Sequence, residues 1–270
     1  RKVASRLEKA ITTAITPGGL FQALGFKYYG PVDGHNVDTM RKHLEDLKDI
    51  PGPKLLHAVT VKGKGFAPAE REQTKWHAQS SPFDKITGKS LAPEKKGPKI
   101  PRYQHIFGDA IVELAEEDER IVGITPAMPS GSSLWPLMNN FPDRAFDVGI
   151  AEQHSITFAA GLAAEGKKPF AAIYSSFLQR AYDQVIHDVA IQNLPVVFCI
   201  DRAGIAGADG PTHHGLYDIS YLRAVPNMII SSPLNEQELR DMMYTASKYE
   251  EAAWAIRYPR GEATGMDFRK

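Results

Sequence analysis

The sequence has 270 residues, of which 43% are hydrophobic, and it contains 32 basic and 32 acidic side chains. This length and composition allow a folded core in one large or two ordinary domains and exclude a disordered chain. The formal net charge of zero excludes a general attraction to nucleic acid or to an anionic membrane, so any anion site must be local. No apolar run reaches the roughly 18 residues of a membrane helix and no secretory signal opens the chain, so we expect a cytoplasmic protein, or a plastid protein if the source is a plant.

The first hundred residues hold few predicted elements. Apolar residues at helical spacing predict a helix over 1–16, which Pro17 ends, and a second amphipathic helix over 37–47. The apolar run at 55–61 predicts a buried strand. Prolines, glycines and lysines then increase and the hydrophobic period fades, which predicts an interdomain linker over 80–102. These elements are too few for a complete α/β domain.

From residue 103 onward, helical and strand-like segments alternate. Predicted helices cover 103–117, 132–140, 152–165, 177–192 and 235–249, and predicted strands cover 120–125, 145–149, 169–174, 195–201, 227–231 and 253–257. Strands separated by helices of this length need crossover connections, which give a parallel sheet covered on both faces. We therefore predict a doubly wound α/β domain over 103–266. The single cysteine, Cys199, lies in an apolar strand and is expected to be a core residue, not a nucleophile.

Glu152 is a candidate functional residue because it falls at the turn between a short strand and the helix predicted over 152–165. A carboxylate in the first turn of a helix stabilises the helix dipole and needs no chemical role. The carboxyl end of a strand in an open α/β sheet is also where ligands bind. Position alone therefore leaves a structural and a functional role open for Glu152.

Arginines and histidines lie in other turns of the predicted sheet. Arg180, Arg202 and Arg260 follow or end predicted strands, so their turns converge on one crevice. The guanidinium group matches phosphate oxygens bidentately, which predicts a phosphate site, and isolated surface ion pairs are the alternative. His213 and His214 are adjacent and lack the ligand spacing of a zinc site, whereas a histidine in a glycine-rich loop suits proton transfer near neutral pH.

Several segments carry a resemblance to a known family. Ala-Glu-Gln-His at 151–154, with Asp-Val-Gly-Ile before it and Phe-Ala-Ala-Gly-Leu shortly after, resembles the pyrimidine-binding domain of thiamine diphosphate enzymes of the transketolase group. The segments at 174–184 and 201–213 narrow this resemblance to the 1-deoxy-D-xylulose-5-phosphate synthase family. The resemblance extends from about Pro17 to Gly265. It implies a transferase that condenses pyruvate with D-glyceraldehyde 3-phosphate and releases CO₂, the first step of the non-mevalonate isoprenoid pathway, whose product also feeds thiamine biosynthesis.

The resemblance also implies roles for individual residues. Glu152 would be the activating carboxylate at the aminopyrimidine of thiamine diphosphate, Phe177 would stack on that ring, and Lys62 would lie on the cofactor side. His213 and His77 would take part in catalysis. From the residues alone, the turn that contains Lys62 could equally be an ordinary basic turn, and a histidine in a polar loop, as His77 is, is usually a solvated surface residue. The residues implied for substrate binding are Tyr174, Arg180, Arg202, Asp209 and Arg260.

The chain departs from the family in one respect. The family holds Mg²⁺ and the diphosphate through a Gly-Asp-Gly motif with a later asparagine, and the sequence contains no such motif. We therefore expect an internal fragment without metal ligands of its own, in which residues 1–79 end the diphosphate-binding domain and 103–266 form the pyrimidine-binding domain of a homodimeric enzyme. We expect negligible turnover by the chain alone. The alternatives are ketol transfer between sugar phosphates, as in transketolase, and a non-catalytic module for dimerisation or metabolite binding.

Overall fold

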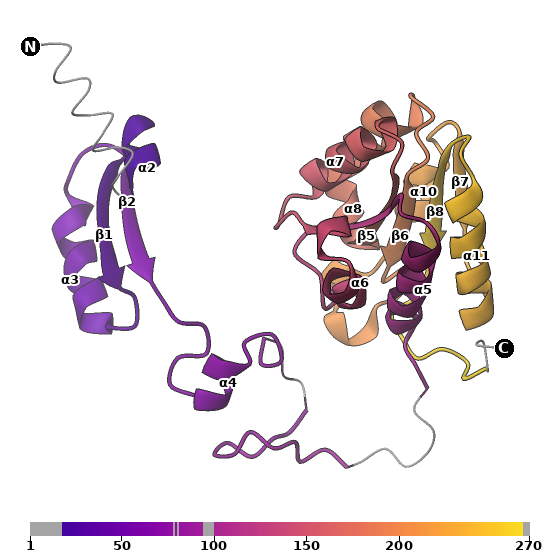
Figure 1. Cartoon of the computed structure of the whole chain (residues 1–270). Coiled ribbons are helices and arrows are strands. Elements are labelled where there is room, and N and C mark those ends of the chain that lie inside the picture. The colour runs from indigo at the N-terminus through magenta and orange to yellow at the C-terminus, as the bar shows by residue number, and fades with distance from the viewer. Residues whose placement is uncertain (1–17, 78, 80, 94–99, 267–270) are drawn as a thin grey trace, which may run out of the picture. The chain divides into compact units, whose positions relative to one another are not determined.

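The computed structural model describes residues 18–77, 79, 81–93 and 100–266. The chain divides into two compact units, Arg1–Lys96 and Gly97–Lys270 (Figure 1). Their described parts, residues 18–93 without 78 and 80, and residues 100–266, are called the smaller unit and the larger unit below, and each is described by itself. The helix predicted over 1–16 lies outside the described residues. Within the described residues, no helix has both the length and the apolar character needed to cross a membrane.

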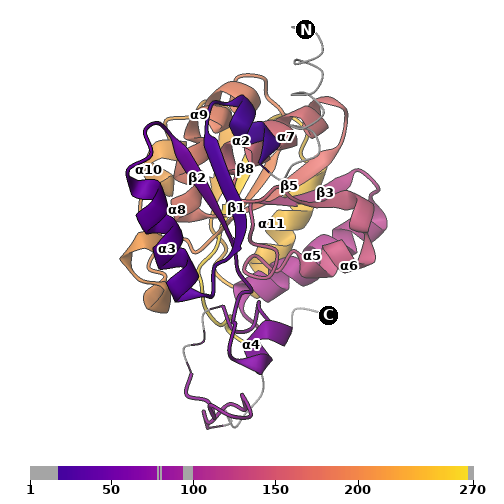
Figure 2. The same ribbon diagram turned by 90° about the vertical axis from the view of Figure 1, so that its left-hand side faces the viewer.

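The smaller unit is built on two parallel strands joined by a helix. Its elements are α2 (Gly19–Ala23), β1 (Lys27–Asp33), α3 (Val37–Lys48), β2 (Lys54–Val59) and α4 (Ala67–Arg71). Figure 2 shows β1 and β2 side by side, with α3 running along them. Helix α3 begins after Asn36 because the Asn36 Oδ1 accepts a hydrogen bond from the Thr39 backbone N–H (2.9 Å), which satisfies one free donor of the first turn. The helix predicted over 37–47 and the strand predicted over 55–61 are confirmed, apart from their ends.

An aromatic cluster follows β2. The ring of Trp76 meets the rings of Phe66 and Phe83 with centroid distances of 4.9 and 4.7 Å. Phe83 belongs to a turn that closes on itself through a bridge to Ser90. Residues 81–91, which lie within the predicted linker, therefore have local structure, and through Phe83 they pack on Phe66 and Trp76. The fading hydrophobic period did not reveal it, because three aromatic side chains are enough to form this cluster.

The larger unit is an α/β sandwich around a six-stranded sheet. Its helices are α5 (Tyr103–Glu117), α6 (Trp135–Asn140), α7 (Glu152–Ala164), α8 (Ser175–Leu178), α9 (Tyr182–Gln184), α10 (Asp218–Leu222) and α11 (Glu236–Lys248). Its strands are β3 (Ile121–Thr125), β4 (Ala145–Asp147), β5 (Lys168–Tyr174), β6 (Val197–Asp201), β7 (Met228–Ser231) and β8 (Ala253–Arg257). The strand order is β4-β3-β5-β6-β8-β7, and every pairing is parallel.

Two hydrophobic cores cover the two faces of this sheet. Along β5, Phe170 and Ala172 join the core with α5, α6 and α11, whereas Ala171 and Ile173 join the core with α7, α8 and α10. This alternation follows from the two-residue period of a strand, and because both faces are covered β5 is apolar from Pro169 to Ile173. Figure 1 shows α5 and α11 packed together on their side of the sheet. The predicted doubly wound α/β fold is confirmed, and Cys199 is fully buried, which raises the pKa of its thiol.

The helix predicted over 177–192 is the main difference within this fold. The segment consists of α8, a 3₁₀ turn (Gln179–Ala181), α9 and a π-helical stretch (Val185–Ala190). Its buried stripe is nevertheless continuous through Leu178, Ala181 and Val185, all fully buried. Hydrophobic periodicity reports which side chains face the core, and it does not report which carbonyl each N–H bonds, so the change of helix type was not predicted.

The strand predicted over 145–149 ends at Asp147. The Asp147 Oδ1 accepts hydrogen bonds from the backbone N–H groups of Ala127 (2.8 Å) and Gly149 (3.0 Å), which turns the chain out of the sheet. Gly149 takes a left-handed conformation (φ +72°) that a glycine adopts without strain. This turn leads directly into α7 and sets the position of Glu152.

The chain enters and leaves the larger unit at one place. The Ala263 N–H donates to the Pro101 carbonyl (2.8 Å) and the Tyr103 N–H donates to the Gly261 carbonyl (3.2 Å). The fully buried Glu236 fastens the exit segment, because its carboxylate accepts hydrogen bonds from residues 264–266 at 2.7 to 3.0 Å. The entry and exit segments are therefore paired with each other and tied to the first turn of α11.

Candidate active site

The candidate site residues of the larger unit lie at the carboxyl edge of its sheet. Tyr174 ends β5, Arg202 follows β6, Arg260 follows β8, and Glu152 opens the helix after β4. The chain passes from β3 to the outer strand β4 and then returns to β5 on the other side of β3. Open α/β sheets bind ligands at such a reversal of strand order, outside the carboxyl ends of the strands. Buried hydroxyl groups of Ser175 and Tyr258 at this edge have no hydrogen-bond partner within the described residues.

Glu152 is a buried carboxylate at the start of a helix. The residue is 6% exposed and is the first residue of α7, where the helix dipole favours a negative charge. Its Oε1 accepts a hydrogen bond from Arg180 Nη1 (2.6 Å), whose side chain is 63% exposed. The helix over 152–165 and the position of Glu152 at its first turn are thus confirmed. A carboxylate with this burial suits a dry site better than a solvent-exposed helix end.

Phe177 joins this carboxylate to the rest of the site. The Arg180 guanidinium lies 5.6 Å from the centre of the Phe177 ring. The same ring is stacked on Tyr174 (centroids 5.3 Å apart) and meets the edge of His213 (5.4 Å). Burial raises the pKa of the Tyr174 phenol to about 12, although the nearby Arg202 charge lowers it, so the phenol is protonated at neutral pH.

Two arginines and one aspartate form the polar end of the site. The Arg202 guanidinium lies 4.0 Å from the centre of the Tyr174 ring. Asp209 Oδ2 is 2.8 Å from Arg260 Nε and 3.7 Å from Arg202 Nε. A carboxylate oxygen therefore occupies the point on which two guanidinium groups converge, which shows that this point accepts an anion.

A loop from Ala203 to Gly215 carries Asp209 and His213. Gly204 and Gly215 close the loop through two reciprocal backbone hydrogen bonds of 2.8 and 2.7 Å. Gly215 has to be a glycine, because a Cβ there would collide with the Arg202 carbonyl and the Ser175 side chain. His214 fastens the loop from inside, where its Nδ1 accepts a hydrogen bond from the Ala206 N–H (3.0 Å).

The contacts connect every site residue that was predicted on the larger unit. The connection runs from Glu152 to Arg180, Phe177, Tyr174, Arg202, Asp209 and Arg260, with His213 beside Phe177. Lys62 and His77 are exposed residues of the smaller unit. Their roles remain predictions. No cluster of three or more possible metal ligands occurs among the described residues.

Sequence reasoning missed three residues that hold Arg202. Its Nη1 donates to the Gly131 carbonyl (2.9 Å) and to Gln104 Oε1 (3.1 Å), and it pairs with Asp201. Gly131 also approaches the Tyr174 hydroxyl so closely that a Cβ would collide with it. Asp201 could have been noticed as an acid at the end of an apolar strand, whereas Gln104 and Gly131 carried no local signal.

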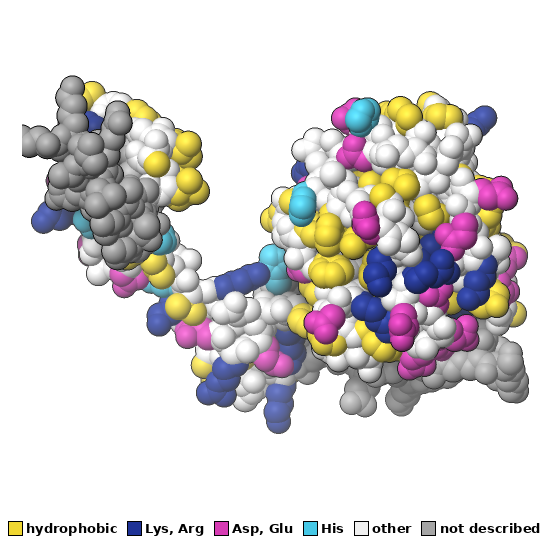
Figure 3. All heavy atoms as spheres, turned by 45° about the horizontal axis from the view of Figure 1, so that its top comes forward, with side chains coloured by type: hydrophobic (Ala, Val, Ile, Leu, Met, Phe, Trp, Pro, Cys, Tyr) yellow, Lys and Arg dark blue, Asp and Glu magenta, His cyan; other side chains and the backbone are white. Residues whose placement is uncertain are grey.

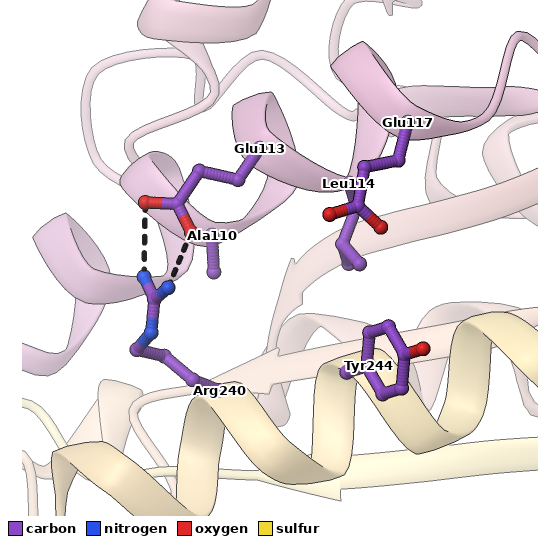
Figure 4. Close-up of a pocket in the computed structure, with 6 residues that line it drawn as sticks. All are labelled: Ala110, Glu113, Leu114, Glu117, Arg240 and Tyr244. Atoms are coloured by element: carbon purple, nitrogen blue, oxygen red, sulfur yellow. Dashed lines mark hydrogen bonds and ion pairs between the residues drawn. The ribbon is translucent and has the colours of Figure 1, made fainter. Parts of the chain in front are cut away.

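Two further arginine–carboxylate pairs of the larger unit lie outside this site. Arg257, one residue before Tyr258, pairs with the buried Asp218 (2.8 Å). A small cavity of about 130 Å³ lies between α5 and α11, where Arg240 of α11 pairs with Glu113 of α5 (Figure 4). On the face in Figure 3, basic and acidic side chains of the larger unit lie next to one another. Local arrangement, not net charge, therefore creates the anion site.

The fold and this site define the class of protein. The chain belongs to the family described as transketolase, pyrimidine binding domain, whose family model matches residues 100–265. A second family model, described as 1-deoxy-D-xylulose-5-phosphate synthase, matches residues 1–60. The resemblance predicted from the sequence is confirmed at both levels.

Curated relatives carry the more particular description. A 1-deoxy-D-xylulose-5-phosphate synthase of Chlorobaculum tepidum is 58% identical over 266 residues, covering 98% of this chain and 42% of the relative. Synthases of Cytophaga hutchinsonii and Aquifex aeolicus are each 56% identical, over 96% and 98% of this chain and 41% of each relative. The chain therefore spans about two fifths of the length of the curated relatives it matches.

Solved structures agree on the fold. A split gene transketolase, described as an inactive beta4 tetramer, is 28% identical with a TM-score of 0.53, covering 60% of this chain and 53% of that chain. Transketolase from Leishmania mexicana is 20% identical with a TM-score of 0.56, covering 65% of this chain and 28% of that chain. At 20% identity the second comparison shows the fold alone.

Proposed function

We propose that this chain supplies the pyrimidine-binding half of a 1-deoxy-D-xylulose-5-phosphate synthase. The reaction would be the decarboxylative condensation of pyruvate with D-glyceraldehyde 3-phosphate, which yields 1-deoxy-D-xylulose 5-phosphate and CO₂. The observation that carries this proposal is the continuous line of contacts from the buried Glu152 to the paired Arg202 and Arg260. It joins a carboxylate suited to an aminopyrimidine with an anion site suited to a phosphorylated aldehyde. The curated relatives named for this reaction support it.

Thiamine diphosphate is the cofactor that this proposal requires, and the residues fit its pyrimidine end. Glu152 is buried, and among the described residues only Oε1 of its carboxylate accepts a hydrogen bond, so Oε2 remains for a ring nitrogen. Glu152 would hold a proton at that nitrogen, and Phe177 would offer an apolar surface beside the ring. When bound, the cofactor supplies the nucleophilic carbon that attacks pyruvate. The magnesium ion and the diphosphate would be held by residues outside this sequence.

The substrate roles follow from charge and position. Arg202 and Arg260 would bind the aldehyde phosphate through their Nε edges, which already converge on an oxygen of Asp209. Asp209 would have to yield this place to the phosphate. Arg180 and Tyr174 would border the space between the phosphate and the pyrimidine, and His213 would move a proton to or from the condensing carbonyl oxygen.

Lys62 and His77 are assigned by resemblance alone. We propose Lys62 as a cofactor contact and His77 as a catalytic residue, both contributed by the end of the diphosphate-binding domain at 1–79. They lie between the two ranges matched by the family models, 1–60 and 100–265, so neither match includes them. Variants of these two residues are therefore tested separately from those of the larger unit.

A homodimer is part of the proposal. Ile150, two residues before Glu152, is 85% exposed although it is apolar, and a second copy of the chain would cover it. Sedimentation of the protein before and after Ile150→Glu would test this, with a dimer expected before the change and dissociation after it. A monomer in both cases would contradict the proposed dimer without affecting the proposed reaction.

A chimera tests the proposed reaction. The 266 matching residues of the Chlorobaculum tepidum synthase would be replaced by those of this chain, and CO₂ release from pyruvate would be measured with D-glyceraldehyde 3-phosphate present. We expect activity, with a loss of about 100-fold or more after Glu152→Gln, because an essential proton position is removed. Glu165→Gln, an exposed residue just beyond the other end of α7, is the matched control.

Two results would contradict the proposal. A chimera that uses ketose phosphates as donors and releases no CO₂ from pyruvate would favour a transketolase-type reaction. An equal response of the two glutamate variants would show that Glu152 has no special chemical role. The unmodified 270-residue chain is expected to show no steady CO₂ release by itself.

A further inference from the structure

Asp201 is a buried charged residue that the proposed reaction does not use. It ends β6, is 0% exposed, and lies opposite Tyr174 in the register of β5 and β6. Its Oδ1 accepts a hydrogen bond from the Arg202 backbone N–H (2.6 Å), and its Oδ2 pairs with Arg202 Nη1. One carboxylate thus binds both the main chain and the side chain of the next residue.

Arg202 has an unusual backbone conformation at this point. Its φ of +58° lies in the left-handed region, which a side chain with a Cβ rarely adopts. The two bonds from Asp201 compensate for this conformation and direct the guanidinium back over the Tyr174 ring. The position of Arg202 therefore depends on Asp201 and not on the intrinsic preference of the backbone.

The two sides of the Arg202 guanidinium differ in their partners. Nη1 donates hydrogen bonds to Asp201, Gly131 and Gln104. Among the described residues, no other nitrogen of this guanidinium donates a hydrogen bond. Nε is buried without a hydrogen-bond partner among those residues, and Asp209 Oδ2 lies 3.7 Å away on that side. The arginine is thus anchored by one nitrogen and has a donor left over toward the anion site.

We infer that Asp201 is a positioning residue, which anchors Arg202 through Nη1 and so presents the Nε edge to an anionic oxygen of the substrate. This inference rests on the phosphate site of the proposed function. Without Asp201, the Arg202 backbone could leave its left-handed conformation, and the Nε donor of its side chain would lose its fixed direction. Burial raises the pKa of Asp201 to about 6, whereas the Arg202 charge lowers it, so the carboxylate depends on its arginine in turn.

The chain contains a matched control for this inference. Asp218 is also buried (1% exposed) and binds an arginine, Arg257, through two contacts of 2.8 and 3.2 Å. This second pair lies at the ends of α10 and β8 and does not contact Asp209 or Arg260 in the described structure. Asp218→Asn therefore removes an equivalent buried charge without altering the anion site.

The first measurement is the binding of inorganic phosphate to the 270-residue chain by calorimetry or NMR titration. We expect Asp201→Asn to weaken phosphate binding about tenfold or more, because a charge-assisted hydrogen bond loses its fixed geometry. Asp218→Asn is expected to change it by less than about twofold. Arg202→Ala and Arg260→Ala show whether phosphate binds at the proposed place.

The second measurement follows the Arg202 guanidinium itself by side-chain ¹⁵N NMR. Rotation about its Nε–Cζ bond is expected to be slow in the unaltered chain and faster after Asp201→Asn. Arg223, which is exposed and whose side chain has no hydrogen bond or ion pair to a described residue, provides the reference for a mobile arginine. This comparison needs only the unaltered chain, so the inference can be overturned even if Asp201→Asn does not fold.

The outcomes separate the inference from the proposed function. Phosphate binding that depends on Arg202 and Arg260 but responds equally to the two aspartate variants would overturn the inference alone. The same conclusion would follow if Arg202 rotated as fast as Arg223. No phosphate binding by the unaltered chain, or binding that survives both arginine variants, would overturn the proposed phosphate site and the inference with it.

Discussion

In the larger unit every residue of β3, β5 and β6 is buried, whereas in the smaller unit no residue of β1 or β2 is buried. The strands of both units pair in parallel, and a parallel sheet is stable when helices cover both of its faces. The larger unit provides this cover from its own helices. The smaller unit leaves apolar side chains exposed, among them Leu20, Leu24 and Val37 at 66% or more. A parallel sheet is therefore stable by itself when helices cover both of its faces, and it needs a further covering surface when they do not.

The two units, prepared as separate polypeptides, should show the largest difference in stability. Residues 100–266 as a polypeptide are expected to unfold cooperatively on heating, because the sheet retains both of its cores. Residues 18–93 are expected to show no cooperative transition, because two strands and a helix bury too little apolar surface. Circular dichroism and amide hydrogen exchange would measure this. A sharp thermal transition in the 18–93 polypeptide would contradict the comparison.

Removal of one apolar side chain from each unit should give the next largest effect. Phe198 is fully buried in β6, and Phe198→Ala is expected to lower the free energy of unfolding by about 3–5 kcal/mol. Leu44 of α3 is 58% exposed, and Leu44→Ala should cost less than about 0.5 kcal/mol. Urea unfolding of the 270-residue chain gives both values. Similar losses would mean that a surface outside the described structure covers α3.

The pH dependence of stability should differ between buried and exposed carboxylates. Burial raises the pKa of Glu236, but hydrogen bonds from its own N–H, Thr264 and Met266 outweigh it and lower the pKa from 4.5 to about 2. A lowered pKa gives stability that is present above pH 4.5 and lost as the pH falls toward 2. Glu236→Gln should remove this acid-dependent part, about 2–3 kcal/mol, in unfolding measured across that range.

Asp84 of the smaller unit is the counterpart of Glu236. Hydrogen bonds from the Thr87 backbone and hydroxyl lower the pKa of Asp84 as well, but Asp84 is only partly buried, whereas Glu236 is fully buried. Asp84→Asn is therefore expected to leave the acid dependence unchanged within error. A comparable effect of both variants would show that burial does not decide how much each carboxylate contributes to the acid-dependent free energy of unfolding.

Ion pairs should give the smallest effects. Arg41 and Glu45 lie on one helix of the smaller unit with side chains 64% and 54% exposed, and their coupling should be about 0.3–0.5 kcal/mol. Glu113 and Arg240 join α5 to α11 through two hydrogen bonds, and their coupling should approach about 1 kcal/mol (Figure 4). Double-mutant cycles give both values, and a stronger coupling on α3 would reverse the expected order.

Much of the larger unit could be predicted from its sequence, because the pattern that fixes it is local. The apolar run of β5 and the helical spacing in α5 each state which faces are buried, and the fold class follows from their alternation. The position of β8 between β6 and β7 could not be predicted, since strand order depends on pairing between distant segments. The π-helical stretch at 185–190 was missed because side-chain period and hydrogen-bond pattern are separate properties.

The same distinction applies to the candidate site. Glu152, Arg202 and Arg260 were found because each lies in a recognisable turn after a strand. The partners that hold Arg202 were not found, because Gly131 and Gln104 lie 71 and 98 positions away in the sequence. Sequence reasoning thus identified groups that carry charge, and the structure was needed to show what fixes their direction.

The pairing of the entry and exit segments has a mechanical consequence. The Pro101–Ala263 and Tyr103–Gly261 hydrogen bonds place both connections at one point of attachment. A pull on the exit segment would first load the hydrogen bonds from residues 264–266 to Glu236, and then these two backbone bonds, before it reached the sheet. Because Arg260 directly precedes Gly261, tension that passed these bonds would reach Arg260 next.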